Sequence, residues 1–319
     1  MTNQQVRATE THIVADFSNG EFPTIQKFPH PIQMSVLPVV AYRCGAEFVP
    51  LGTCFTVSPQ GLVLTARHVI EEMTALNARR DQNSEQWWIG CLYVAEPAPE
   101  HEVPDLLGGI LPAHKVFLCD DLDIAAIQLN LPTDTRTGKT LRMPASRISP
   151  GLPPVGSFCF AVGYHSMSWK DCAGADAQVY QNFSASRGLI KVLHTPYRDK
   201  VSLNFPCFET SARFDGGMSG GPIMGDNGAV IGVVCSSLGN PDELGHISYG
   251  SLIGPALLLQ LEAKQPDGAE GFVFLHDFVV GGAVVVDDTI SGLKSQRLED
   301  RLIIDFGDGK TFQNLLRKS

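Results

Sequence analysis

The chain has 319 residues, of which 44% are apolar, and this is enough to build one large domain or two small ones around a buried core. The net charge is −10 and the lysines and arginines form no cluster, so we expect no nucleic-acid partner. No apolar run reaches membrane-spanning length, and residues 1–20 lack the apolar segment of a signal peptide. We therefore expect a cytoplasmic protein with no membrane partner.

Residues 1–31 are interpreted as an N-terminal arm with one short strand. From residue 32 onward, short apolar runs alternate with turn residues, and the chain holds 31 glycines and 21 prolines. We expect strands over residues 36–42, 54–57, 62–65, 87–94, 124–129, 158–162, 188–193, 229–235 and 247–253. This spacing predicts an all-β sandwich or barrel body over residues 32–264.

Two helices are expected within this body. One covers residues 70–80, and the other covers residues 255–263, where a proline stands at the start and leucines share one face. A Gln-Pro-Asp-Gly stretch then resembles a linker. Residues 265–319 contain strand candidates at 271–275 and 302–306 and are expected to form a small C-terminal extension. Its role is open: packing on the body, contact with a regulatory partner, or formation of a homo-oligomer.

The eight cysteines match neither a disulfide scaffold nor a metal-binding motif. Without a signal peptide, we expect reduced and mostly buried thiols. The histidines also lack metal-ligand spacing. The sequence therefore predicts no metal and no organic cofactor.

The most distinctive segment is residues 214–222, with the sequence FDGGMSGGP. Its glycines allow unusual turns that can present the hydroxyl of Ser219. The N–H groups of Gly217 and Ser219 could then converge on one point, as the donors of an oxyanion hole do. The alternative is a glycine-rich surface turn with no chemical role.

A serine nucleophile needs a base and a group that orients the base. Residues 62–69, with the sequence LVLTARHV, place His68 at the end of an apolar strand. Residues 119–127, with the sequence CDDLDIAAI, place Asp123 at the start of a buried-looking strand, where a carboxylate is costly unless it is paired. Taken singly, each could be a structural residue at a strand end. Their combination with Ser219, in the order His, Asp, Ser, favours a catalytic triad.

These three blocks resemble those of the chymotrypsin/trypsin-like serine peptidases. The sequence GTCFTVSPQGLVLT at residues 52–65 resembles the HtrA/Deg branch more narrowly, as do ETSA before the serine loop and VIGVV after it. The resemblance implies two six-stranded antiparallel barrels and an extended polypeptide as substrate. It also implies that His68 is the general base and then acid, Asp123 its orienter, and Ser219 the nucleophile, with Gly217 and Ser219 forming the oxyanion hole.

Several positions depart from the family pattern. Met218 replaces the aspartate that secreted relatives use for activation, and Val69 replaces a cysteine, which favours a reducing compartment. The HtrA branch usually carries a PDZ domain, but residues 265–319 are too few for one. Whether the oxyanion hole is formed at rest is left open.

The resemblance also implies that the strand near Cys235 pairs with the substrate backbone. The substrate-binding residues expected from it are Arg213, Val234, Cys235, Ser236, Ser237 and His246. Arg213 stands six positions before Ser219, where trypsin-like preference for basic residues requires an acidic side chain. A basic pocket could prefer acidic residues. The alternative is a solvent-facing Arg213 beside a small apolar pocket.

Three alternatives to a general endopeptidase remain: an esterase, a binding module and a peptidase of very narrow specificity. The glycine loop also fits the Gly-x-Ser-x-Gly motif of α/β-hydrolase esterases, but that fold needs a helix after the serine. A second alternative is a catalytically silent binding module that keeps the barrels. A third is a peptidase that cuts only itself or one partner.

Overall fold

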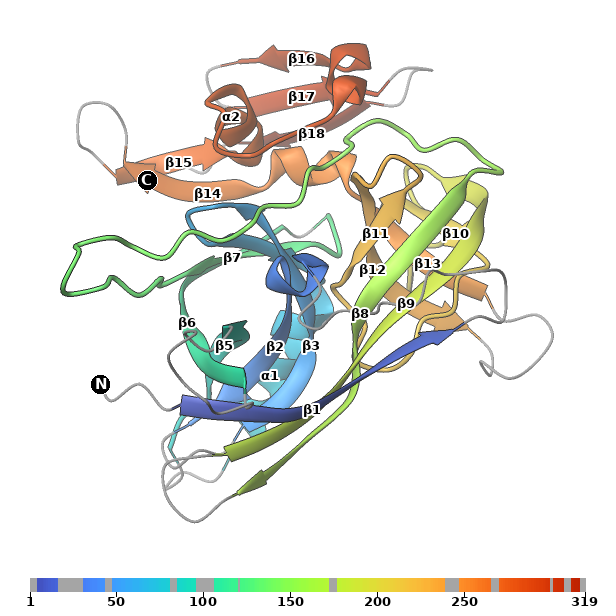
Figure 1. Cartoon of the computed structure of the whole chain (residues 1–319). Coiled ribbons are helices and arrows are strands. Elements are labelled where there is room, and N and C mark those ends of the chain that lie inside the picture. The colour runs from blue at the N-terminus through green and yellow to red at the C-terminus, as the bar shows by residue number, and fades with distance from the viewer. Residues whose placement is uncertain are drawn as a thin grey trace.

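A computed structural model describes residues 5–16, 31–43, 48–80, 85–95, 106–119, 121–171, 177–238, 247–264, 270–298, 301–306 and 311–315. Strands dominate the fold, and two barrels lie side by side (Figure 1). Within these ranges no helix is long and apolar enough to span a lipid bilayer. The predicted all-β class, with two closed six-stranded antiparallel barrels, is confirmed.

The first barrel closes in the order β5-β2-β3-β4-β7-β6, with β6 pairing back onto β5. Its strands are β2 (Val36–Tyr42), β3 (Phe48–Ser58), β4 (Leu62–Thr65), β5 (Trp88–Ala95), β6 (Leu106–Leu118) and β7 (Ala125–Leu129). The 3₁₀ helix η1 (Pro31–Met34) leads into β2, and α1 (Arg67–Arg79) follows β4. The strands are rich in β-branched and aromatic residues, which suit a pleated surface buried on its inner face.

The second barrel closes in the order β8-β9-β10-β13-β12-β11. Its strands are β8 (Phe158–Asp171), β9 (Ala177–His194), β10 (Cys207–Thr210), β11 (Pro222–Gly225), β12 (Val230–Leu238) and β13 (Ile247–Leu252). The N-terminal segment contributes β1 (Gln5–Asp16), which is 12 residues long. β1 pairs in parallel with β9 and antiparallel with β6, so one strand joins the sheets of both barrels.

The prediction of one helix over residues 255–263 is wrong, because only the first part of this segment is helical. A 3₁₀ helix, η2 (Gly254–Leu258), occupies only its first part, and β14 (Gln260–Lys264) comes directly after it. β14 forms an antiparallel hairpin with β15 (Glu270–Phe274), and the ladder satisfies backbone groups that a continued helix would have bonded internally. The leucines of this region are buried in both the helical and the extended part. Their spacing was therefore not evidence for one buried face of a continuous helix.

The C-terminal residues pack on the barrels rather than standing apart, as the orange and red elements of Figure 1 show. They form α2 (Leu275–Val280), η3 (Asp288–Gly292), β16 (Lys294–Arg297), β17 (Arg301–Asp305) and β18 (Thr311–Leu315). Leu275, Leu302 and Ile304 are almost fully buried and belong to the same apolar core as the first barrel. Strand pairing between β14 and β15 crosses the boundary expected at residue 265.

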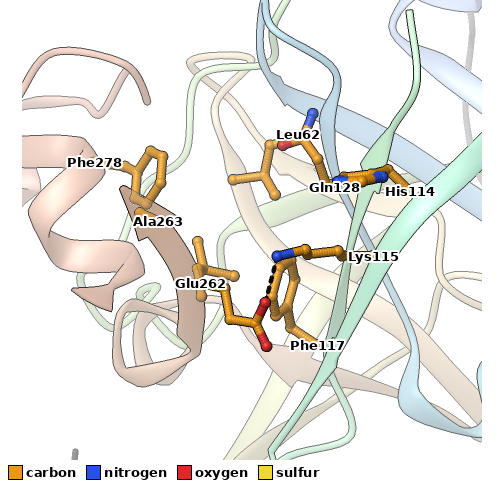
Figure 2. Close-up of a pocket in the computed structure, with 9 residues that line it drawn as sticks. Leu62, His114, Lys115, Phe117, Gln128, Glu262, Ala263 and Phe278 are labelled. Carbon is orange, nitrogen blue, oxygen red and sulfur yellow. Dashed lines mark hydrogen bonds and ion pairs between the residues drawn. The ribbon is translucent and has the colours of Figure 1, made fainter. Parts of the chain in front are cut away.

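A cavity of about 210 Å³ lies where this extension meets the first barrel (Figure 2). An ion pair between Lys115 of β6 and Glu262 of β14 crosses it. Leu62, Phe117 and Phe278 supply apolar lining. None of the residues predicted to act in catalysis lines this cavity.

Candidate active site

His68 lies where a buried strand turns into a helix. β4 ends at Thr65, and Ala66 has an extended backbone at the N-cap of α1. The helix is anchored by its apolar residues Val69 and Ile70, which are buried. The side chain of His68 is 40% exposed, so the imidazole remains accessible at this junction.

The structure brings Asp123 against His68. Nδ1 of His68 lies 3.0 Å from Oδ2 and 3.1 Å from Oδ1 of Asp123. Oδ1 also accepts the backbone N–H of His68 at 3.2 Å. Asp123 is only 8% exposed, and these bonds provide the partners that a buried carboxylate requires. Because a carboxylate only accepts, Nδ1 carries the proton and Nε2 is left as the acceptor.

The environment of His68 changes its affinity for a proton. Burial acts to lower the pKa of the imidazole. The hydrogen bond and the negative charge of Asp123 act against burial, and the charge of Glu71 adds to them. Together they outweigh it, so the pKa of His68 is raised above its ordinary value of 6.5. The pair is therefore arranged to stabilise an imidazolium.

The loop before β11 holds Ser219 between two tight turns. The N–H of Met218 donates to the carbonyl of Asp215 at 3.1 Å, and the N–H of Gly221 donates to the carbonyl of Met218 at 2.9 Å. Gly217 has a φ of 97°, a left-handed conformation that favours glycine. Among the described residues, the backbone N–H groups of Gly217 and Ser219 have no acceptor.

Ser219 joins the His68–Asp123 pair through Cys235. The hydroxyl of Ser219 donates to the carbonyl of Cys235 at 3.4 Å, which is long for an O–H···O bond. A side-chain ligand atom of Cys235 lies within 4.8 Å of ligand atoms of both His68 and Asp123. Gly52 is a second shared neighbour, because a Cβ there would contact Ser219 and the residue after His68, Val69. The three predicted triad residues are thus brought together.

Cys235 owes its position to a bulge in β12, where the register with β13 shifts between Val234 and Ser236. Burial, followed by the charge and hydrogen bond of Asp123, raises the pKa of the Cys235 thiol. In the described part of the chain, His68, Asp123 and Cys235 form the single group with a spacing that could hold a metal ion. Because imidazole and carboxylate bond each other directly, we interpret the group as a hydrogen-bonded network.

Arg213 does not carry an unbalanced charge. Its Nε donates to Oδ1 of Asp215 at 2.8 Å, and its backbone N–H donates to the hydroxyl of Ser186 at 2.7 Å. Both charged side chains are partly exposed. The guanidinium is therefore paired inside its own loop.

The other residues predicted to bind substrate lie on β12 or beyond it. Val234 is buried, and its backbone groups bond Gly220 and Gly221 of the serine loop, each at 2.8 Å. Ser236 and Ser237 are half-buried and pair with β13. His246 lies outside the described residues.

Sequence reasoning missed Thr53, a fully buried residue of β3 that contacts the serine loop. Its hydroxyl donates to the carbonyl of Gly217 at 2.9 Å, and its N–H donates to the carbonyl of Ser219 at 2.8 Å. The segment GTCF shows a threonine in a strand and contains no signal for a partner 164 positions away.

The esterase alternative is excluded by the element that comes after Ser219. β11 begins at Pro222 and pairs antiparallel with both β8 and β12. An α/β-hydrolase would have a helix there.

The thiols expected to be reduced and buried are so at the six described positions, Cys54, Cys91, Cys119, Cys159, Cys207 and Cys235. Two of them, Cys54 and Cys91, have Sγ atoms 3.4 Å apart without a disulfide.

Among solved structures, the chain is similar to the Rv3671c protease from M. tuberculosis in its active form (18% identity, 70% of this chain and 78% of that chain, TM-score 0.42). It is also similar to the MamO protease domain from Magnetospirillum magneticum (15%, 79% and 97%, 0.41) and to Deg5 (18%, 69% and 83%, 0.41). No curated protein matches the chain.

The family described as "Trypsin-like peptidase domain" matches residues 52–233. The match begins in β3, extends into β12, and contains His68, Asp123 and Ser219. It covers more than half of the 319 residues. This chain belongs to the trypsin-like peptidase family.

Proposed function

We propose that this protein is a serine endopeptidase, with Ser219 as nucleophile, His68 as general base and then acid, and Asp123 as the group that orients the imidazole. The observation that carries the proposal is the two-oxygen contact of Asp123 with Nδ1 of His68, next to a serine presented between two turns. An imidazole held in this tautomer offers Nε2 to the serine proton.

The reaction uses each of these groups in turn. The hydroxyl of Ser219 leaves its long bond to the carbonyl of Cys235 and donates to Nε2 of His68 as the oxygen attacks a peptide carbonyl. The imidazolium that forms is stabilised by the carboxylate of Asp123. It then protonates the leaving amine, and an acyl-enzyme remains on Ser219. Water repeats the two proton transfers and releases the second product.

We further propose that the N–H groups of Gly217 and Ser219 bind the oxyanion. Both are free of internal acceptors within the described chain, whereas the N–H of Met218 between them is used in a turn. Two free donors flanking a bonded one support a preformed hole, because donors already committed to other acceptors could not stabilise the developing charge.

The proposed substrate is an extended polypeptide. Within the described residues, the backbone–backbone bonds of β12 to β11 and the serine loop reach only Val234, and beyond it this edge of β12 receives only the long bond from the hydroxyl of Ser219 to the carbonyl of Cys235. An extended chain can add to such an edge through its backbone. Because Arg213 is paired with Asp215, we propose a pocket for an uncharged side chain and not for an acidic one.

A fluorophosphonate probe tests the proposal, because it labels only an activated serine. We expect wild type to be labelled and Ser219→Ala and His68→Ala to be unlabelled. The matched control is Ser291→Ala, which removes an exposed hydroxyl on η3 and should leave labelling unchanged. Labelling that persists in Ser219→Ala would show that the nucleophile is another residue. A wild type that is neither labelled nor cleaves unfolded casein would instead support the silent binding module.

A further inference from the structure

Thr53 lies at the contact between the two barrels, and each of its polar groups is used. Its hydroxyl donates to the carbonyl of Gly217 at 2.9 Å and accepts the N–H of Tyr164 at 3.0 Å. Its N–H donates to the carbonyl of Ser219 at 2.8 Å, and its carbonyl accepts the hydroxyl of Thr65 at 2.7 Å. The residue is fully buried, so water does not compete for these bonds.

These bonds act on the segment that carries the two free N–H groups. Of the three carbonyls from Gly217 to Ser219, the first and third are bound by Thr53, and the middle one is bound inside the loop. A peptide unit is planar, so holding the carbonyl of Gly217 also sets the plane that leads into Met218. Gly217 has no side chain to restrict its own rotation, so this restraint must come from another part of the fold.

The restraint comes from the opposite barrel. Thr53 belongs to β3, whereas Tyr164 lies on β8 and Gly217 in the loop before β11. One hydroxyl therefore ties a strand of the second barrel, a strand of the first barrel and the serine loop together. A Cβ on Gly217 would lie 2.8 Å from the carbonyl oxygen of Tyr164, which shows how closely the loop fits against β8.

We propose that Thr53 is a positioning residue for the oxyanion loop, holding the N–H groups of Gly217 and Ser219 in the orientation that the transition state needs. This inference rests on the proposed peptidase activity. The Gly217–Met218 peptide lies between the two peptide units that carry these N–H groups, so a change in its orientation moves both donors. Donors must lie about 2.7–3.1 Å from the developing oxyanion, so such a movement costs transition-state stabilisation. Substrate backbone binding to β12 is not involved, and the loss falls on kcat with little change in KM.

The test is Thr53→Val, which keeps the shape of the side chain and removes the hydroxyl. We expect kcat on fluorescently labelled casein to fall roughly 10- to 100-fold, somewhat less than the loss from deleting an oxyanion donor itself. Thr53→Ser keeps the hydroxyl and should restore kcat. Thr53→Ala removes the same hydroxyl without adding a methyl group, and serves if the valine variant does not fold.

The matched control is Thr56→Val on the same strand. Thr56 is equally buried, and its hydroxyl bonds the carbonyls of Ser35 and Pro144, away from the serine loop. Melting temperatures of both valine variants should fall, because each removes hydrogen bonds made by a buried threonine hydroxyl. Only Thr53→Val should lose kcat.

The outcomes separate this inference from the function on which it rests. Suppose that the wild type is labelled by the fluorophosphonate probe and cleaves casein, and that Thr53→Val has the same kcat as Thr56→Val. Thr53 is then merely structural, and the proposal is overturned. If Thr53→Ser is as impaired as Thr53→Val, the hydroxyl is not the cause, and the proposal is overturned as well. If wild type itself neither labels nor cleaves, the proposed function falls first, and the positioning role falls with it.

Discussion

Replacing Asp123 by asparagine changes one oxygen to an amide nitrogen without changing the shape of the side chain. Oδ1 accepts the backbone N–H of His68 at 3.2 Å, so the amide oxygen of the variant is expected at this position. The NH₂ group then takes the place of Oδ2, 3.0 Å from Nδ1 of His68. An NH₂ group donates, so Nδ1 becomes an acceptor and the imidazole proton moves to Nε2. The nitrogen that should take the proton of Ser219 is then blocked.

The expected loss in kcat is about 10⁴-fold, the size found when such a carboxylate is replaced in other triads. At 1.36 kcal/mol for each tenfold change, this corresponds to about 5 kcal/mol of transition-state stabilisation. The assay is the initial rate on labelled casein, together with ¹⁵N NMR of the imidazole, which reports the tautomer. Asp121→Asn, at an exposed position close by, is the control and should keep the wild-type rate. A kcat for Asp123→Asn within tenfold of wild type, or an unchanged tautomer, would refute this reasoning.

Three further predictions concern pH dependence, the serine loop and the C-terminal extension. The pKa of His68 is raised above 6.5, and the base must be neutral, so the acid limb of the kcat/KM profile should have its midpoint above pH 6.5. Because the pKa of His68 is higher in the folded state, protonation of His68 stabilises the fold at pH values below the unfolded-state pKa. This stabilisation is lost as the pH rises through the folded-state pKa, and urea titrations at several pH values would measure the loss. Gly220→Ala should lower the free energy of unfolding by at least about 2 kcal/mol, because φ is 85° and a Cβ would lie 2.2 Å from two oxygens. In Gly216→Ala the new Cβ meets nothing within 4 Å, so stability measured in the same urea titration should hardly change. Leu302→Ala should cost about 2–5 kcal/mol and destabilise the whole molecule in one calorimetric transition, whereas Glu262→Gln, in an exposed ion pair, should cost less than about 1 kcal/mol. Two separate transitions in Leu302→Ala would mean that the extension folds independently of the barrels.

Local sequence signals predicted the strands that carry their own pattern. β2 and β4 have the bounds expected from their apolar runs, because each run is short, continuous and flanked by residues that do not continue its apolar pattern. β10 and β11 were missed, since each has four residues and β11 begins with a proline. Their pairing depends on neighbouring strands far away in the sequence. The helix expected from Pro255 failed for the same reason, because pairing with β15 decided the conformation of β14.

In the candidate site, too, local motifs predicted some features, whereas contacts between distant segments determine others. Short motifs drew attention to the three residues of the proposed triad, because each motif encodes a local turn or strand end that presents one side chain. The thiol of Cys235 lies against Asp123 because of a bulge, and Thr53 reaches the serine loop because of how the two barrels meet. Neither contact depends on residues adjacent in sequence, so no motif could report them.

The bond between Thr53 and Gly217 also has a consequence for biosynthesis. The two residues are 164 positions apart, and at about 5–20 residues per second a ribosome needs roughly 10–30 s to make the chain between them. His68 and Asp123 are made during this interval, before the serine loop has been synthesised. Until Ser219 has been made and the second barrel has folded against the first, the growing chain lacks the proposed nucleophile and cannot perform the proposed reaction.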